Sequence, residues 1–163
     1  MWNLSVKKLT LAGVMAALVF VMTYVPKVPV PVTGGYVHLG DGAIFLSVLL
    51  LGPLGIPAAA IGSALADVLG GYLVYALPTL LIKAWMALIV CRVWKPESWL
   101  RAAVAFVLAE FVMVMGYYGF EYALYGAAAA WAAVGPNCIQ GIAGVALGLV
   151  CHALYPRLKM MVK

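Results

Sequence analysis

A few polar and ionisable side chains lie within stretches of this chain that are otherwise apolar. Asp67, Lys83 and Gln140 each lie four or five residues inside an apolar stretch, and Glu110 and Glu121 share another. An ionised side chain in hydrocarbon costs at least about 2.5–3.5 kcal/mol, so such groups face a bundle interior or a water-filled cavity. Carboxylate, ammonium and amide groups gathered in one cavity would bind a small polar molecule through charge-assisted hydrogen bonds.

The composition indicates that these groups are surrounded by a lipid bilayer. Hydrophobic residues make up 67% of the chain and charged residues 9%. About 20 apolar residues cross a bilayer, so a chain of 163 residues provides five or six crossings. We therefore expect an all-α integral membrane protein in which residues 1–163 form a single transmembrane domain.

Six transmembrane helices are predicted, of which the second and third are short. A connection rich in Pro and Gly, residues 26–39, follows the first helix and should be extended with a sharp turn. The second helix, with Asp41 as its N-cap, is only about 16 Å long, so it and the third are either two full spans or a re-entrant hairpin. The predicted helices are 7–25, 41–51, 58–70, 78–94, 100–122 and 136–154, with a short interfacial helix in the connector 126–134.

The distribution of basic residues predicts the orientation. With the N-terminus in the cytoplasm, the outer connections carry only Lys27, whereas the inner termini and loop carry eight basic residues. This bias follows the positive-inside rule and places both termini in the cytoplasm, as expected for a multi-pass protein of a bacterial cytoplasmic membrane. The eight are Lys7, Lys8, Arg92, Lys95, Arg101, Arg157, Lys159 and Lys163.

This topology places most of the buried polar groups in the outer half of the bundle. The helical rise puts Asp67, Lys83 and Gln140 about 6–7 Å below the outer surface, with Glu110 nearer the midplane. Two interpretations stay open: an Asp67–Lys83 ion pair that only joins two helices, or an outward-facing pocket for a polar ligand. The further candidates for that pocket are Tyr36, His38, Asp41, Tyr117, Glu121 and Asn137.

Several functional classes have no support in the sequence. There is no Ser/His/Asp constellation, no paired metal-ligand motif and no phosphate-binding loop, so we expect neither an enzyme nor a cofactor or metal site. The net charge of +5 comes from basic residues at the ends of apolar stretches, which argues against nucleic-acid binding. Uphill transport would therefore need energy from another subunit or from an ion gradient.

Small residues on the first helix form a patch suited to close helix contact. Ala12 and Ala16 lie one turn apart in an A-x-x-x-A pattern, which permits helix backbones to approach. The partner helix is either inside this chain or in another subunit.

Two central motifs resemble those of a known family, the substrate-binding S components of energy-coupling factor (ECF) vitamin transporters. The first is GYVHLGD at residues 35–41, leading to IFL at 44–46; the second is IGSALADVLGGY at 61–72, preceded by LLGP at 50–53. The opening Lys7-Lys8-Leu9, followed by Ala12 and Ala16, is similar to the first helix of that family. The similarity is to the group that includes pyridoxine, hydroxymethylpyrimidine and riboflavin S components.

The resemblance implies a function and a set of partners. Such proteins bind a vitamin or precursor near the outer face, under a lid formed by the connection after the first helix. They associate with a transmembrane coupling subunit and two ATPase subunits, and the A-x-x-x-A patch, here Ala12 and Ala16, contacts the coupling subunit. Two other classes stay open: an ion-coupled carrier or channel with Glu110 as proton site, and a membrane assembly factor without transport activity.

Overall fold

The computed structural model describes residues 5–31 and 33–162, which form six α-helices, one short 3-10 helix and a two-stranded hairpin. Ser5 and Ser98 cap two of the helices by accepting hydrogen bonds from Lys8 N–H and Arg101 N–H. The elements are α1 (Val6–Tyr24), β1 (Lys27–Val30), β2 (Gly35–His38), α2 (Gly40–Leu51), η1 (Gly52–Leu54), α3 (Gly55–Gly70), α4 (Leu73–Val93), α5 (Trp99–Tyr125) and α6 (Ala127–Val162).

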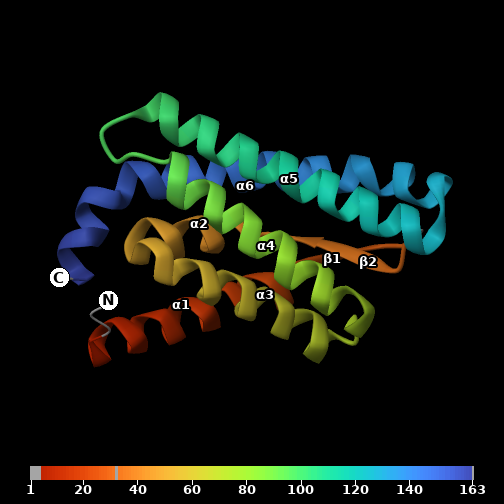
Figure 1. Cartoon of the computed structure of the whole chain (residues 1–163), viewed down its shortest axis with the longest axis horizontal. Coiled ribbons are helices and arrows are strands. Elements are labelled where there is room, and N and C mark those ends of the chain that lie inside the picture. Colours follow the sequence, from red (N-terminus) through yellow and green to blue (C-terminus); the bar gives the residue numbers. More distant parts are fainter. Residues whose placement is uncertain (1–4, 32, 163) are drawn as a thin grey trace.

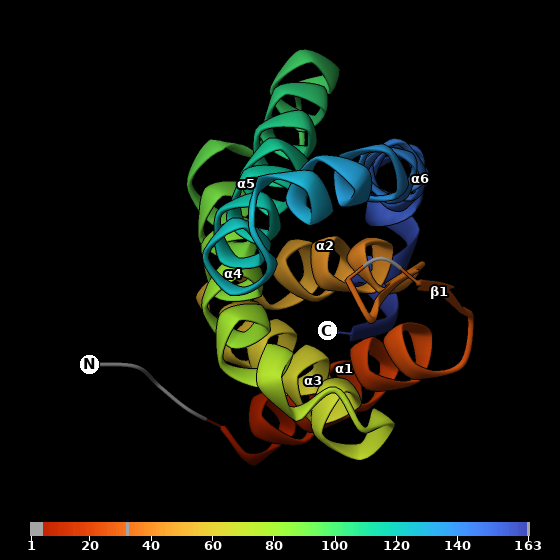
Figure 2. The same ribbon diagram turned by 90° about the vertical axis from the view of Figure 1, so that its right-hand side faces the viewer.

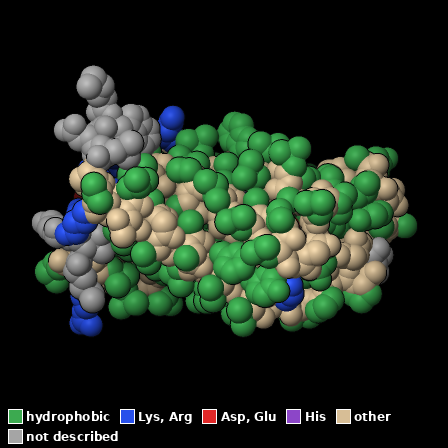
Figure 3. All heavy atoms as spheres, turned by 90° about the horizontal axis from the view of Figure 1, so that it is seen from below, with side chains coloured by type: hydrophobic (Ala, Val, Ile, Leu, Met, Phe, Trp, Pro, Cys, Tyr) green, Lys and Arg blue, Asp and Glu red, His purple; other side chains and the backbone are tan. Residues whose placement is uncertain are grey.

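The helices run lengthwise through an elongated bundle (Figure 1). Five apolar segments of the described chain are long enough to cross a membrane, and α2 with α3 counts as one of them. The start of α1, the α4–α5 connection and the end of α6 lie at one end of the molecule (Figure 1). Basic side chains gather at that end on an otherwise largely apolar face (Figure 3), which is the end that we expect to face the cytoplasm. Lys163 lies outside the described residues.

The short helix α2 lies in the centre of the bundle, with the longer helices around it (Figure 2). Nine of its 12 residues are buried. The Phe45 ring stacks on Phe106 of α5 with 4.7 Å between ring centroids. Because α2 packs against α1, α3, α4 and α6, polar groups on it are held away from lipid.

The hairpin that precedes α2 consists of residues 27–38, with β1 and β2 paired antiparallel. Pro29 pairs with Tyr36, and Lys27 pairs with His38 at the open end. The hairpin lies beside the helices in the half of the molecule away from the basic end (Figure 1). It therefore occupies the outer part of the layer that α2 is too short to fill.

Several helix boundaries differ from the sequence prediction. Helix α4 begins at Leu73, five residues before the predicted start at Pro78, so Pro78 is inside the helix. The connector 126–134 is not a separate helix, because α6 runs without interruption from Ala127 through Pro136. A proline is tolerated inside a membrane helix where neighbouring groups satisfy the freed carbonyl. The extended connection 26–39 was predicted, but its strand pairing was not.

Helices α1 and α3 approach closely at Gly62. A Cβ atom at this position would meet the carbonyl oxygen of Ala16 well inside van der Waals contact, and it would lie 3.0 Å from Val19 Cβ. Only a residue without a side chain fits there, which is the small-residue packing that membrane helices use.

We expect Gly62→Ala to lower the stability of the bundle by about 1–3 kcal/mol, because the added methyl group forces α1 away from α3. The matched control is Gly13→Ala on the same pair of helices, since a Cβ atom at Gly13 has nothing within 4 Å. The midpoint of thermal unfolding in mild detergent measures the difference. Equal midpoints for the two variants would contradict the close packing.

Candidate functional site

A cavity lies between the hairpin and the parts of α3, α4, α5 and α6 away from the basic end. Its volume is about 30 Å³, which is enough for about two water molecules. The lining residues are Val30, Thr33, Gly35, Tyr36 and His38 from the hairpin, Asp67 from α3, Tyr75 and Thr79 from α4, Tyr117 and Glu121 from α5, and Ala133, Asn137 and Gln140 from α6.

The sequence predicted nine pocket residues, and seven of them line this cavity. The other two, Asp41 and Lys83, do not line it but form a buried pair next to Gln140. Charged and amide side chains from separate apolar stretches thus converge, as the cost of exposing them to lipid requires.

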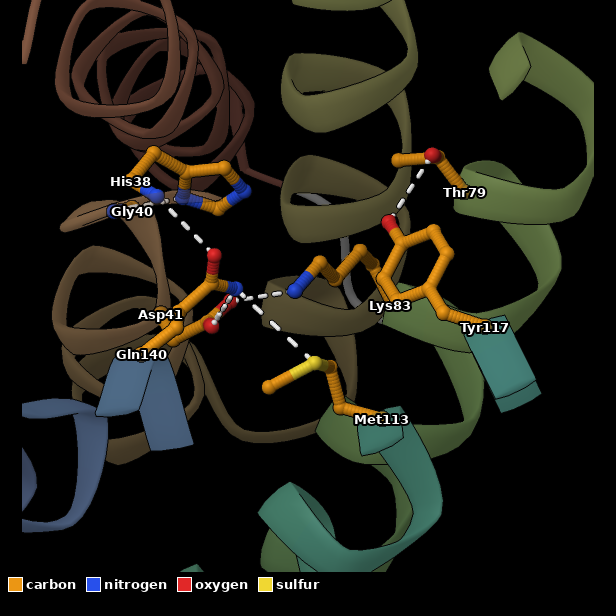
Figure 4. Close-up of polar contacts among 8 residues, drawn as sticks. All are labelled: His38, Gly40, Asp41, Thr79, Lys83, Met113, Tyr117 and Gln140. Atoms are coloured by element: carbon orange, nitrogen blue, oxygen red, sulfur yellow. Dashed lines mark hydrogen bonds and ion pairs between the residues drawn. The ribbon is translucent and has the colours of Figure 1, made fainter. Parts of the chain in front are cut away.

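The buried ion pair joins α4 to the start of α2 (Figure 4). Lys83 Nζ lies 2.5 Å from Asp41 Oδ1, and the two side chains are 0% and 1% exposed. Gln140 Nε2 donates to the other oxygen, Asp41 Oδ2, at 2.6 Å. The Asp67–Lys83 ion pair, one of the two interpretations that the sequence left open, is not formed, because Lys83 pairs with Asp41. The predicted role of Asp41 as N-cap is wrong, because Leu39 is the N-cap and Asp41 points into the bundle.

Gln140 also connects this pair to the hairpin. Its Oε1 accepts a hydrogen bond from His38 N–H at 2.9 Å. The His38 ring is held in turn, because its Nδ1 accepts from Gly40 N–H at 2.9 Å, so this nitrogen carries no proton. One amide side chain on α6 therefore contacts both the hairpin backbone and the buried carboxylate (Figure 4).

Two further carboxylates line the cavity, each held by a tyrosine hydroxyl. Tyr36 donates to Asp67 Oδ1 at 2.7 Å, and Tyr75 O–H lies 3.3 Å from Glu121 Oε1 and 3.0 Å from the Thr33 carbonyl. The second oxygens, Asp67 Oδ2 and Glu121 Oε2, are buried and have no hydrogen-bond partner among the described residues. Such atoms need a donor from a ligand or a water molecule.

Aromatic rings surround these acidic groups. Tyr36 lies 4.5 Å from the Tyr72 ring and Tyr75 lies 6.5 Å from the Tyr117 ring, measured between centroids. The Tyr117 hydroxyl shares a hydrogen bond of 2.9 Å with Thr79 (Figure 4). A flat heterocycle would find faces to stack on and hydroxyl groups at its edges.

Sequence reasoning did not select Thr33, Tyr75 and Thr79 as pocket residues. Thr79 occurs in an apolar stretch where a threonine has no distinguishing signal, and Thr33 lies in the hairpin turn. Tyr75 was predictable only as a residue at the outer level, where an interfacial aromatic belt is equally expected.

Glu110 lies deeper than the cavity and is 4% exposed. Neither of its carboxylate oxygens has a hydrogen-bond partner among the described residues. Its side chain packs against the glycine positions 141 and 144 of α6, near Asp41. Two carboxylates therefore face the single ammonium group of Lys83 in the same region.

The small-residue patch on α1 is only partly covered by the rest of the chain. Ala12 and Ala16 are half-buried, and the Ala16 carbonyl faces Gly62 of α3. Gly13 and Ala17, one residue further along, are exposed. The patch thus contributes to packing inside the bundle and also leaves small residues on the outer surface of α1.

The chain is similar to known membrane transport proteins over nearly its whole length. The family model described as ECF-type riboflavin transporter, S component, matches residues 3–157. The thiamine precursor transporter HmpT of Lactococcus lactis subsp. cremoris (strain MG1363) is 32% identical over 159 residues, which cover 95% of this chain and 91% of the relative. A protein of Pyrococcus woesei, described as an uncharacterized protein in the gap 3'region, is 39% identical over 132 residues, or 80% of this chain and 88% of the relative.

Proposed function

Because this chain belongs to the family of ECF-type riboflavin transporter S components, we propose that the cavity under the hairpin is where it binds its substrate. The substrate is a small water-soluble vitamin or precursor, with a pyridoxine-like or hydroxymethylpyrimidine-like ring as the best single candidate. Similarity to a thiamine precursor transporter supports a vitamin precursor as the substrate.

The observation that carries this proposal is the convergence of polar and aromatic side chains on one buried cavity. In a membrane protein with 67% hydrophobic residues, burying so many polar groups together is costly unless they serve a ligand. In the proposal, Tyr36, His38, Asp67, Tyr117, Glu121, Asn137 and Gln140 contact the ligand, and the Asp41–Lys83 pair beneath them positions Gln140.

The hairpin acts as a lid in this proposal. Its contacts with the helices include three hydrogen bonds through side chains: Tyr36 to Asp67, His38 N–H to Gln140, and Tyr75 to the Thr33 carbonyl. At about 1 kcal/mol each, breaking these bonds costs about 3 kcal/mol. The hairpin can therefore open thermally as a minor state.

The size of the cavity also argues for movement. A space of about 30 Å³ holds waters but not a substituted pyrimidine ring. Ligand entry consequently requires the hairpin to move outward, after which it closes over the occupied pocket.

We expect a bound ligand to protect the hairpin from proteolysis. Pro31 and Gly34 near its turn are exposed, so an outside protease should cleave there whenever the hairpin opens. Saturating ligand should slow this cleavage at least tenfold, measured by mass spectrometry on proteoliposomes. The α5–α6 connection at Gly126, also exposed, is the internal control and should be cleaved at the same rate with and without ligand. If the ligand slows cleavage equally at the hairpin turn and at Gly126, or slows it at neither site, the hairpin is not a lid.

Energy for uptake comes from other subunits in this proposal. The chain associates with a transmembrane coupling subunit and two ATPase subunits, and α1 offers them its small-residue patch around Ala12 and Ala16. Co-purification of the tagged chain from its native membrane, with native mass spectrometry of the retained ligand, tests both halves of the proposal. Recovery of the chain without ATPase subunits would contradict the coupling.

One observation favours a second candidate function, an ion-coupled carrier. Glu110 is buried beside the ion pair, and neither of its oxygens has a hydrogen-bond partner in the part of the chain that the structure describes, a position suited to binding and releasing a proton. Uptake into proteoliposomes that contain only this chain, driven by a pH gradient, distinguishes the two. Uptake that is abolished in Glu110→Gln would support the carrier, and absence of uptake without ATPase subunits supports the S-component role.

A further inference from the structure

The charges around the cavity restrict the chemistry of its ligand. We propose, on the basis of the proposed function, that the pocket selects a heteroaromatic compound that carries no anionic group and presents hydrogen-bond donors at two separate edges. Asp67 and Glu121 accept those donors and thereby determine specificity.

The two carboxylates come from different walls of the pocket. Asp67 is on α3 and Glu121 is on α5. Both helices pack on α4, and the end-on view shows α3 and α5 on either side of it (Figure 2). A ligand between these walls therefore meets one carboxylate on each side.

Each carboxylate has one oxygen in use and one to spare. The Tyr36 hydroxyl donates to Asp67 Oδ1, and the single hydroxyl proton of Tyr75 is shared between the Thr33 carbonyl at 3.0 Å and Glu121 Oε1 at 3.3 Å. The buried oxygens Asp67 Oδ2 and Glu121 Oε2 have no partner among the described residues. The Thr79 hydroxyl lies near Asp67 and is hydrogen-bonded to Tyr117, with either hydroxyl as the donor, and the Thr33 hydroxyl lies near Glu121. An N–H or O–H group of a ligand would satisfy each free oxygen, and an amino group is the natural donor to a carboxylate.

No Lys or Arg side chain is among the residues that line the cavity. Lys83 lies below it and is bonded to Asp41. Lys27 does not line it either, although its Nζ lies 5.3 Å from the centre of the ring of Tyr36, a lining residue, as well as 4.4 Å from that of Tyr24 and 5.2 Å from that of Tyr72. A phosphate or carboxylate on the ligand would consequently be desolvated beside two like charges without a cation to pair with.

The test uses matched pairs of compounds that differ by one anionic group. The pairs are amino-hydroxymethyl-methylpyrimidine, pyridoxine, thiamine and riboflavin, each with its own phosphate monoester. Affinities are measured by isothermal titration on the purified full-length chain in lipid nanodiscs. We expect at least one unphosphorylated compound to bind, and its phosphate ester to bind at least 100-fold more weakly.

Variants then assign this selectivity to the two carboxylates. Asp67→Asn and Glu121→Gln should each weaken binding of the unphosphorylated compound at least tenfold and reduce the discrimination against its phosphate ester. Glu97→Gln, an exposed residue of the α4–α5 connection, is the control and should change neither value. Discrimination is the decisive reading, because a loss of folding would lower both affinities and leave their ratio unchanged.

The outcomes separate this inference from the proposed function. A phosphate ester that binds as tightly as its parent compound overturns the charge selection but leaves a vitamin-binding S component. Unchanged discrimination in both variants overturns the role of Asp67 and Glu121. If none of the eight compounds binds, the charge inference and the proposed ligand class both fall, whereas co-purification with ATPase subunits still tests the transporter role separately.

Discussion

Replacing Lys83 by methionine should destabilise the folded protein by about 3–5 kcal/mol, the largest effect on stability expected of any single substitution considered for this chain. Lys83 is 0% exposed and is the ion-pair partner of Asp41, which is itself 1% exposed. Removing the ammonium group leaves a buried carboxylate whose remaining side-chain donor is Gln140, and an uncompensated buried charge is strongly destabilising. Denaturant titration in detergent micelles, followed by near-UV circular dichroism, measures the change.

A second substitution identifies the cause. The double variant Asp41→Asn with Lys83→Met removes both charges, and we expect it to recover most of the lost stability because no unpaired charge remains. Lys27→Met, at the open end of the hairpin, is the matched lysine control and should cost less than about 1 kcal/mol. If the double variant is as unstable as the single one, lost packing rather than the orphaned charge is responsible.

The double variant Ala12→Trp with Ala16→Trp should abolish uptake in cells while ligand affinity stays within about twofold of the wild type. Both positions are half-buried on α1, and neither lines the cavity. Two indole rings there would prevent close approach of a helix from the coupling subunit, since that approach depends on small side chains. The measurement needs membrane yield, affinity by titration and initial uptake rate on the same variant.

A lipid-facing tryptophan provides the comparison. Leu81 on α4 is 54% exposed, so Leu81→Trp adds the same ring to another outward position and should leave uptake unchanged. If yield and affinity of the α1 variant fall together, the patch serves packing against α3 at Gly62 instead. Uptake at the wild-type rate would remove α1 from the partner interface.

The sequence alone brought together seven of the residues that line the cavity, although not Thr33, Tyr75 or Thr79, for a simple physical reason. A charge in hydrocarbon is so costly that each polar residue in an apolar helix must face inward. Counting helical rise also placed Asp67, Lys83 and Gln140 at similar depth. The sequence therefore predicted that polar side chains from separate helices gather at one level of the bundle. Tyr36, Glu121 and Asn137, from three different segments, line one cavity, and their contact with a ligand stays a prediction.

The pairing of the charges could not be predicted in the same way. Asp67 and Lys83 were placed at similar depth by helical rise, whereas Asp41 was expected to cap the start of the second helix. The hairpin folds back beside the helices, so α2 starts inside the bundle and carries Asp41 to Lys83. Where the chain reverses direction, the depth of a residue in the membrane depends on tertiary structure. Counting residues along a helix gives no information about that.

The predicted helix boundaries were wrong where a proline was interpreted as the first residue of a helix. Pro78 and Pro136 both fit the first turn of a helix, yet each lies inside a longer one. Inside a bundle, neighbouring helices and water can compensate for the missing N–H. The tertiary environment therefore decided these boundaries against the local rule.

The length of α6 has a mechanical consequence. This helix has 36 residues, about 54 Å at 1.5 Å per residue, which exceeds a hydrocarbon core of about 30 Å. Its two prolines, Pro136 and Pro156, are 20 residues apart (156 − 136), so the segment between them is itself about 30 Å long. Proline is where a helix bends most readily, and these two positions would lie near opposite membrane surfaces. The segment between the prolines contains Asn137 and Gln140 in its first turns. It therefore forms a stiff lever, and a tilt at one membrane surface moves its opposite end at the other surface.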